Sequence, residues 1–263
     1  MIQQTNIQQR GFTLIELMLA MTFIAILLLT IAMTVIQMGT IYNRGMAIKE
    51  VNQASRDVAD DLRRSVQASG VFEINPSGAD TTDFVRFMRP VNGNNVAVSG
   101  RLCLGSYSYI WNTITAIETN FVDRARYLNS AGTAGDTVNF AKIADTGKKY
   151  CAKDTNGALL YKNILFADAS NTTELLKPGD RTIRVLSFNV TTTPSAYDPT
   201  SGQRIYHVSY GFGTGTEGSV AEAMVMTNGV PTSCLPPNDP KSNFSYCNAQ
   251  QFAIVLRAGN TVN

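Results

Sequence analysis

Residues 17–36 read LMLAMTFIAILLLTIAMTVI, twenty positions without a charged residue, a proline or a glycine. At a rise of 1.5 Å per residue, a helix of this length spans about 30 Å, the thickness of the hydrocarbon core of a bilayer. Leucine, methionine, isoleucine and alanine are all compatible with a helix. Because lipid cannot satisfy backbone polar groups, the stretch predicts a transmembrane helix.

A secretory signal peptide is a weaker interpretation of the same stretch. Such a peptide has an apolar region of about 7–15 residues, followed by small residues at a cleavage site. Here the apolar run is longer and no such site follows, while Gln37, Tyr42 and Asn43 continue a helical pattern. A plain membrane anchor stays open as the alternative.

One acidic residue, Glu16, stands just inside the polar edge of the apolar run. Ionisable residues in a membrane segment are costly, and they usually have a function. Residues 10–17 read RGFTLIEL, so a basic residue, a glycine and a phenylalanine precede the glutamate at a fixed offset. Together with the polar leader at 1–11, this arrangement resembles the prepilin signature of the type IV pilins and the pseudopilins of type II secretion.

The resemblance covers about the first fifth of the chain, and it implies a processing step. Prepilin peptidase would cut between Gly11 and Phe12 and then methylate the new amine of Phe12. A glycine suits the cut because a backbone without a side chain enters a narrow site. The carboxylate of Glu16 would pair with an N-terminal amine, its own or a neighbouring subunit's, because a charge in an apolar bundle needs an opposite charge close by.

The resemblance also implies partners and a location. The partners would be other pilins or pseudopilins through the N-terminal helix, prepilin peptidase, an inner-membrane assembly platform and membrane lipid. The chain would cross the cytoplasmic membrane once with its C-terminal domain outside, and would then enter a pilus or pseudopilus. Many major pilins carry a proline midway along the apolar segment, and none occurs here between residues 12 and 69, which favours a minor pilin or a pseudopilin.

The helix is predicted to continue well beyond the membrane. Apolar residues recur at three- and four-residue spacing as a single stripe formed by Val51, Ala54, Val58, Leu62 and Val66. Gly70 then predicts the end of the helix. We therefore expect a leader at 1–11, a helix at 12–69 that crosses the membrane at about 14–38, and an extracytoplasmic β-rich domain at 70–263.

The C-terminal domain is predicted to consist mainly of strands. Runs rich in β-branched and aromatic residues indicate strands at 84–88, 96–104, 183–190, 205–212 and 252–256. Residues 107–180 are interpreted as a large insertion of loops with a short helix near 114–127. The expected fold class is α+β, a long N-terminal transmembrane helix packed on an antiparallel β-sheet domain, which is also the pilin-like architecture that the resemblance implies.

Four cysteines, Cys103, Cys151, Cys234 and Cys247, are too far apart to form a CxxC site. An even number of cysteines in an exported domain predicts two disulfides, although four cysteines allow three pairings that the sequence does not decide. The proline-rich stretch between Cys234 and Cys247 favours a bond between these two. Cys103 and Cys151 then pair by elimination.

No enzyme chemistry is indicated, and we expect no cofactor and no metal. Residues 213–218 match GxGxxG without the βαβ unit that a dinucleotide site needs, and 154–157 resemble only the start of a calcium loop. The single histidine, His207, stands on an alternating strand pattern. The leading interpretation is therefore a minor pilin or pseudopilin subunit.

Two further functions remain as alternatives. One is a tip pilin that binds a surface or DNA, and the other is a plain membrane-anchored domain. The net charge is only +2, and the local concentrations of basic residues are small. No motif therefore supports nucleic acid as a partner. If the chain bound nucleic acid, the candidate residues would be Arg124, Arg126, Lys148 and Lys149.

Overall fold

The computed structural model describes residues 12–75, 84–89, 96–176, 182–198, 202–215 and 221–259. The chain divides into two compact units, residues 1–43 and residues 44–263, which are described separately below. Gly11 and the rest of the predicted leader lie outside the described residues.

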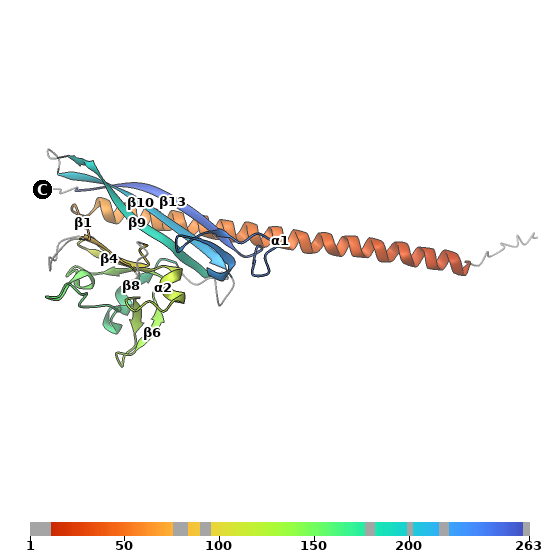
Figure 1. Ribbon diagram of the computed structural model, residues 1–263, viewed down its shortest axis with the longest axis horizontal. Coiled ribbons are helices and arrows are strands. Elements are labelled where there is room, and N and C mark those ends of the chain that lie inside the picture. Colours follow the sequence, from red (N-terminus) through yellow and green to blue (C-terminus); the bar gives the residue numbers. More distant parts are fainter. Residues whose placement is uncertain are drawn as a thin grey trace, which may run out of the picture. The chain divides into compact units, whose positions relative to one another are not determined.

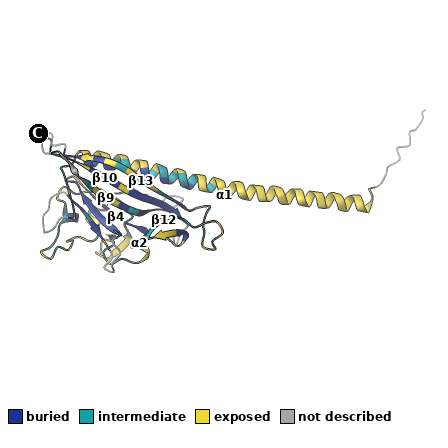
Figure 2. Ribbon diagram, turned by 45° about the horizontal axis from the view of Figure 1, so that its top comes forward, coloured by how far each residue is buried: buried dark blue, intermediate teal, exposed yellow. Residues whose placement is uncertain are grey.

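Helix α1 (Leu14–Gln67) is 54 residues long and belongs to both units. It is two residues shorter at each end than the predicted helix. Within the first unit, residues 12–42 are all exposed, as the yellow part of the helix in Figure 2 shows. The structure therefore confirms a long N-terminal helix that is apolar enough to cross a membrane.

Within the second unit, α1 buries the predicted stripe. Val51, Val58, Leu62 and Val66 are at most 1% exposed, and Ala54 is partly buried against the same core. These positions share one face of the helix because they recur every three or four residues. The spacing thus fixes which side of the helix meets the domain.

A six-stranded sheet forms one layer of the domain, in the order β1-β2-β3-β4-β7-β8. All its neighbours are antiparallel except β1 and β2, which are parallel. The strands are β1 (Glu73–Ile74), β2 (Phe84–Met88), β3 (Ser99–Cys103), β4 (Tyr107–Asn112), β7 (Phe140–Ala144) and β8 (Thr172–Glu174).

A three-stranded antiparallel sheet, ordered β13-β10-β9, packs with the second part of α1 (Figure 1). Its strands are β9 (Thr182–Asp198), β10 (Gln203–Gly215) and β13 (Asn248–Ala258). The predicted alternation in β10 is confirmed, since Tyr206, Val208 and Tyr210 are buried whereas His207 and Ser209 are exposed.

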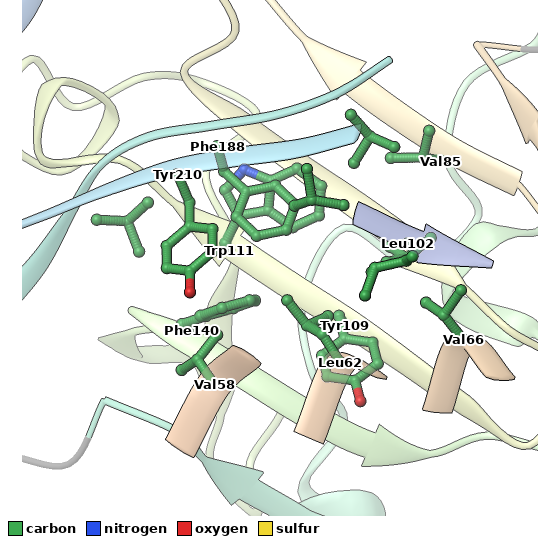
Figure 3. Close-up of a cluster of buried hydrophobic side chains, with 14 of the residues drawn as sticks. Val58, Leu62, Val66, Val85, Leu102, Tyr109, Trp111, Phe140, Phe188 and Tyr210 are labelled. Carbon is green, nitrogen blue, oxygen red and sulfur yellow. The ribbon is translucent and has the colours of Figure 1, made fainter. Parts of the chain in front are cut away.

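The main core lies where α1 and the two sheets meet (Figure 3). Trp111 of the six-stranded sheet lies at its centre, with its ring centroid 4.5 Å from that of Phe188 in the three-stranded sheet. Leu62 reaches the same cluster from the helix. The α+β fold class is therefore as predicted, with two main sheets.

The interpretation of residues 107–180 as an insertion was wrong in part. This region contributes β4, β7 and β8 to the six-stranded sheet, and β4 lies in its middle. The short run at 107–112 is almost wholly buried, and a buried strand lacks the alternation that would distinguish it. The predicted helix is present but short: α2 (Ile114–Glu118) ends at Glu118, and Thr119 is its C-cap.

The rest of this region covers the second face of the six-stranded sheet. It forms the hairpin of β5 (Arg126–Leu128) and β6 (Ala134–Thr137) and the turns η1 (Lys149–Cys151) and η2 (Phe166–Asn171). A second core forms beneath it from Ile110, Ala125, Val138, Ala141, Ile143, Tyr150 and Ile164. The six-stranded sheet is consequently buried on both faces.

A hairpin near the C-terminus was not predicted. After the turn η3 (Ala221–Ala223), strands β11 (Met224–Thr227) and β12 (Val230–Cys234) pair antiparallel. Asn228 and Gly229 connect them, both with positive φ, as a tight two-residue hairpin turn requires.

Candidate functional site

The N-terminus of α1 is built around Glu16, which forms a reciprocal cap with Thr13. The backbone N–H of Thr13 donates to Oε2 of Glu16 at 2.9 Å, and the Thr13 hydroxyl donates to the same oxygen at 2.8 Å. In return, the backbone N–H of Glu16 donates to Oγ1 of Thr13 at 3.3 Å. This is a capping box, which satisfies two N–H groups that a helix start otherwise leaves unpaired.

The capping box leaves part of the carboxylate available. Oε1 of Glu16 accepts no hydrogen bond within the described part of the chain, and Glu16 is exposed. Phe12, the residue just before Thr13, is 84% exposed. Phe12, predicted for processing, and Glu16, predicted for assembly, therefore lie together at the start of the helix.

The described part of the first unit, residues 12–43, exposes apolar side chains on every side of the helix. All its large apolar side chains from Phe12 to Tyr42 are exposed. Its threonine hydroxyls turn inward along the helix and donate to backbone carbonyls three or four residues earlier: Thr22 to Leu19, Thr30 to Leu27, Thr34 to Thr30 and Thr40 to Gln37. Such internal bonds are what polar side chains need in lipid.

A polar network that the sequence did not reveal joins α1 to the six-stranded sheet. The Tyr109 hydroxyl donates to Asp61 Oδ2 at 2.7 Å, and Lys142 Nζ donates to Asp61 Oδ1 at 2.8 Å. Ser65 lies 2.6 Å from the same hydroxyl. Burial raises the pKa of Tyr109, so the hydroxyl keeps its proton and stays a donor. The network fixes the rotation of the helix relative to this sheet.

Two disulfides close the domain, and their pairing is the one that the sequence favoured. Cys103 in β3 bonds to Cys151 in η1 and ties the covering segment to the six-stranded sheet. Cys234 at the end of β12 bonds to Cys247 just before β13 and closes the proline-rich loop. The described residues contain no free cysteine.

The two motifs that resemble a dinucleotide site and a calcium loop have structural roles in the residues that the structure describes. Gly213 lies in β10 and pairs with Arg184 of β9. A Cβ at this position would lie 2.9 Å from the Asn248 carbonyl, so the close packing of the strands requires a glycine. Residues 216–218 of the same motif lie outside the described residues. Asp154 accepts the backbone N–H groups of Asn156 and Ala158 and thus caps its own turn.

The four basic residues considered for nucleic acid are half-buried. Lys149 is already paired with Asp168 at 2.6 Å. No group of three potential metal ligands occurs among the residues that the structure describes. These observations leave the helix start as the site with the clearest geometry.

The chain was compared with protein-family models, with curated proteins and with solved structures, and none of them matches. Any functional assignment therefore depends on the sequence motif and on the geometry of α1.

Proposed function

We propose that this chain is a minor pilin or pseudopilin, a subunit that prepilin peptidase processes and that then assembles into, or primes, a type IV pilus or a type II secretion pseudopilus. One observation carries the proposal. The first part of α1 exposes an unbroken apolar surface and holds a single carboxylate at its start.

The apolar surface must be shielded from water by lipid or by another protein, since monomeric soluble proteins rarely expose large apolar patches. Residues 14–43 extend about 45 Å at 1.5 Å per residue, enough for a bilayer with several residues to spare. Lipid covers the helix before assembly, and the helices of other subunits cover it in a filament. Both environments suit a helix whose threonines bond internally.

The carboxylate of Glu16 fixes the position along the filament at which the helix packs against a neighbouring helix. Cleavage before Phe12 creates an amine close to the capping box, and in a filament the amine of a neighbouring subunit approaches from outside. Oε1 of Glu16 is available for either amine. An ion pair in an apolar bundle forms at only one relative position of the two helices, because an unpaired charge there is costly.

The β-rich domain then faces outward. Its two disulfides agree with an oxidising compartment outside the cytoplasmic membrane. The partners of the helix are other pilins or pseudopilins, prepilin peptidase, the assembly platform and membrane lipid.

Processing is tested by changing Gly11 to leucine. We expect the variant to accumulate as the uncut precursor, because a branched side chain blocks the entry of the backbone into the peptidase site. The mass of the membrane-bound protein, measured in cells that contain prepilin peptidase, reports the result. Gln8→Leu places the same side chain three residues earlier and should be cut normally, and a Gly11→Leu chain cut as well as this control would overturn the proposal.

A further inference from the structure

Two arginines lie side by side on the covered face of the six-stranded sheet. Arg86 in β2 and Arg101 in β3 are directly opposed in the antiparallel register, so their side chains point to the same face. Arg101 is completely buried and Arg86 is half-buried. Like charges directly opposite each other destabilise a sheet unless something compensates them.

Neither guanidinium receives that compensation from a hydrogen-bonded carboxylate in the described part of the chain. Arg101 donates to the carbonyls of Gly100 at 2.9 Å and Lys162 at 2.8 Å, and its Nε has no partner. Arg86 donates to the carbonyl of Gly157 at 2.8 Å. Carbonyls satisfy donors but supply no negative charge.

A cavity of about 190 Å³ lies beside Arg86, and Arg101 is not among its lining residues. Its charged lining consists of Arg86, Lys162 and Asp123, and Lys162 Nζ lies 2.7 Å from Asp123 Oδ1. Among the described residues that line the cavity, the two cations Arg86 and Lys162 face the single carboxylate of Asp123, and Arg101 lies next to this lining because it donates to the Lys162 carbonyl.

The imbalance is visible in the electrostatics of Arg101. Burial lowers the pKa of its guanidinium to about 9, Asp123 acts in the opposite direction, and Arg86 lowers the pKa further. A buried charge without a close partner is costly. An anion bound beside Arg86 would therefore stabilise the fold, because it opposes the positive charge that acts on Arg101.

We propose that this cavity binds a small phosphate-like oxyanion, with Arg86 and Lys162 as its ligands. Guanidinium and ammonium groups form charge-assisted hydrogen bonds with phosphoryl oxygens. The cavity lies below the size range of about 300–1,000 Å³ that is typical of drug-sized ligands. The phosphate group comes either from free phosphate or from a lipid headgroup.

The first test is the thermal unfolding of the full chain in dodecyl maltoside micelles, which contain no phosphate, with either sodium phosphate or sodium chloride at equal ionic strength. Phosphate should raise the melting temperature of the wild type, because a ligand that binds only the folded state stabilises it. Arg86→Gln should abolish the shift, whereas Arg257→Gln, which changes an exposed arginine on β13, should retain it. An equal shift in the wild type and Arg86→Gln would overturn the proposal.

A second variant distinguishes loss of the anion site from misfolding of Arg86→Gln. Asp123→Asn removes the carboxylate that, among the described lining residues, competes with the ligand. Phosphate should therefore bind this variant several-fold more tightly than the wild type in isothermal titration calorimetry. Unchanged or weaker binding would contradict the assigned site.

A separate sample holds the chain in phosphatidylglycerol nanodiscs without free phosphate, and it is compared with the phosphate-free micelles. Stabilisation that depends on Arg86 only in these discs assigns the group to lipid, and stabilisation only with free phosphate assigns it to the ion. Stabilisation in neither refutes the site.

Discussion

Replacing Glu16 with glutamine is expected to exclude the chain from filaments while its processing and membrane insertion continue. Glutamine still accepts the Thr13 N–H, because either glutamate or glutamine completes a capping box. It cannot neutralise an amine in the filament core. Since every 1.4 kcal/mol changes an equilibrium tenfold and an unpaired buried charge costs more than this, incorporation should fall by about tenfold or more.

The measurement compares the amount of the protein in sheared filaments with the amount in membranes. Glu16→Ala should lose incorporation as well, and it should also leave the Thr13 N–H without its acceptor in the capping box. Glu50→Gln, a matched change in the second part of α1, serves as the control and should incorporate normally. Normal incorporation of Glu16→Gln would reduce the helix to a simple membrane tether.

Replacing Gly100 with valine is expected to produce the largest loss of stability in the domain. A Cβ at Gly100 would lie 2.0 Å from Cζ2 of Trp111, because the indole ring covers the glycine on the adjacent strand. Trp111 is fully buried and packs against Phe87, Phe140 and Phe188, so it has no free space into which to move. Displacing it should cost about 3 kcal/mol or more in the free energy of unfolding.

Trp111 is the only tryptophan in the chain, so its fluorescence reports unfolding in denaturant directly. Gly147→Val provides the control, since nothing lies within 4 Å of a Cβ at that position. The double variant Gly100→Val, Trp111→Leu and the single variant Trp111→Leu lack the tryptophan, so their unfolding is followed by circular dichroism. The double variant should lose less stability than the sum of the two single changes, because the smaller side chain relieves the clash. Equal midpoints for Gly100→Val and the wild type would show that the indole ring does not lie over Gly100.

The sequence predicts α1 well because two simple signals coincide there. The uncharged run at 17–36 has the length of a bilayer, and the stripe from Val51 to Val66 repeats with the period of a helix. The strand at 84–88 agrees with β2, and the alternation around Tyr206 agrees with β10. These elements are either regular in pattern or bounded by clear breaks.

The strands of the middle region escape prediction for a physical reason. β4 is buried on both faces, so YSYIWN shows no alternation, and its pairing with β3 and β7 depends on contacts that are distant in sequence. The hairpin of β11 and β12 did carry a usable signal, since Asn228-Gly229 is the dipeptide that tight hairpin turns prefer.

The functional residues also differ in whether the sequence alone can reveal them. Glu16 and Phe12 belong to a local motif that a single sequence can reveal. The Asp61–Lys142 pair joins residues 81 positions apart, and Arg86 and Arg101 meet only through strand register. Such sites require the fold before they can be found.

The mass of the mature N-terminus tests the central claim most directly. We expect tandem mass spectrometry of protein purified from cells with prepilin peptidase to show a chain that begins at Phe12 with a methylated amine. A mature chain that begins at Met1, or at any residue other than a methylated Phe12, would contradict the assignment as a pilin-like subunit.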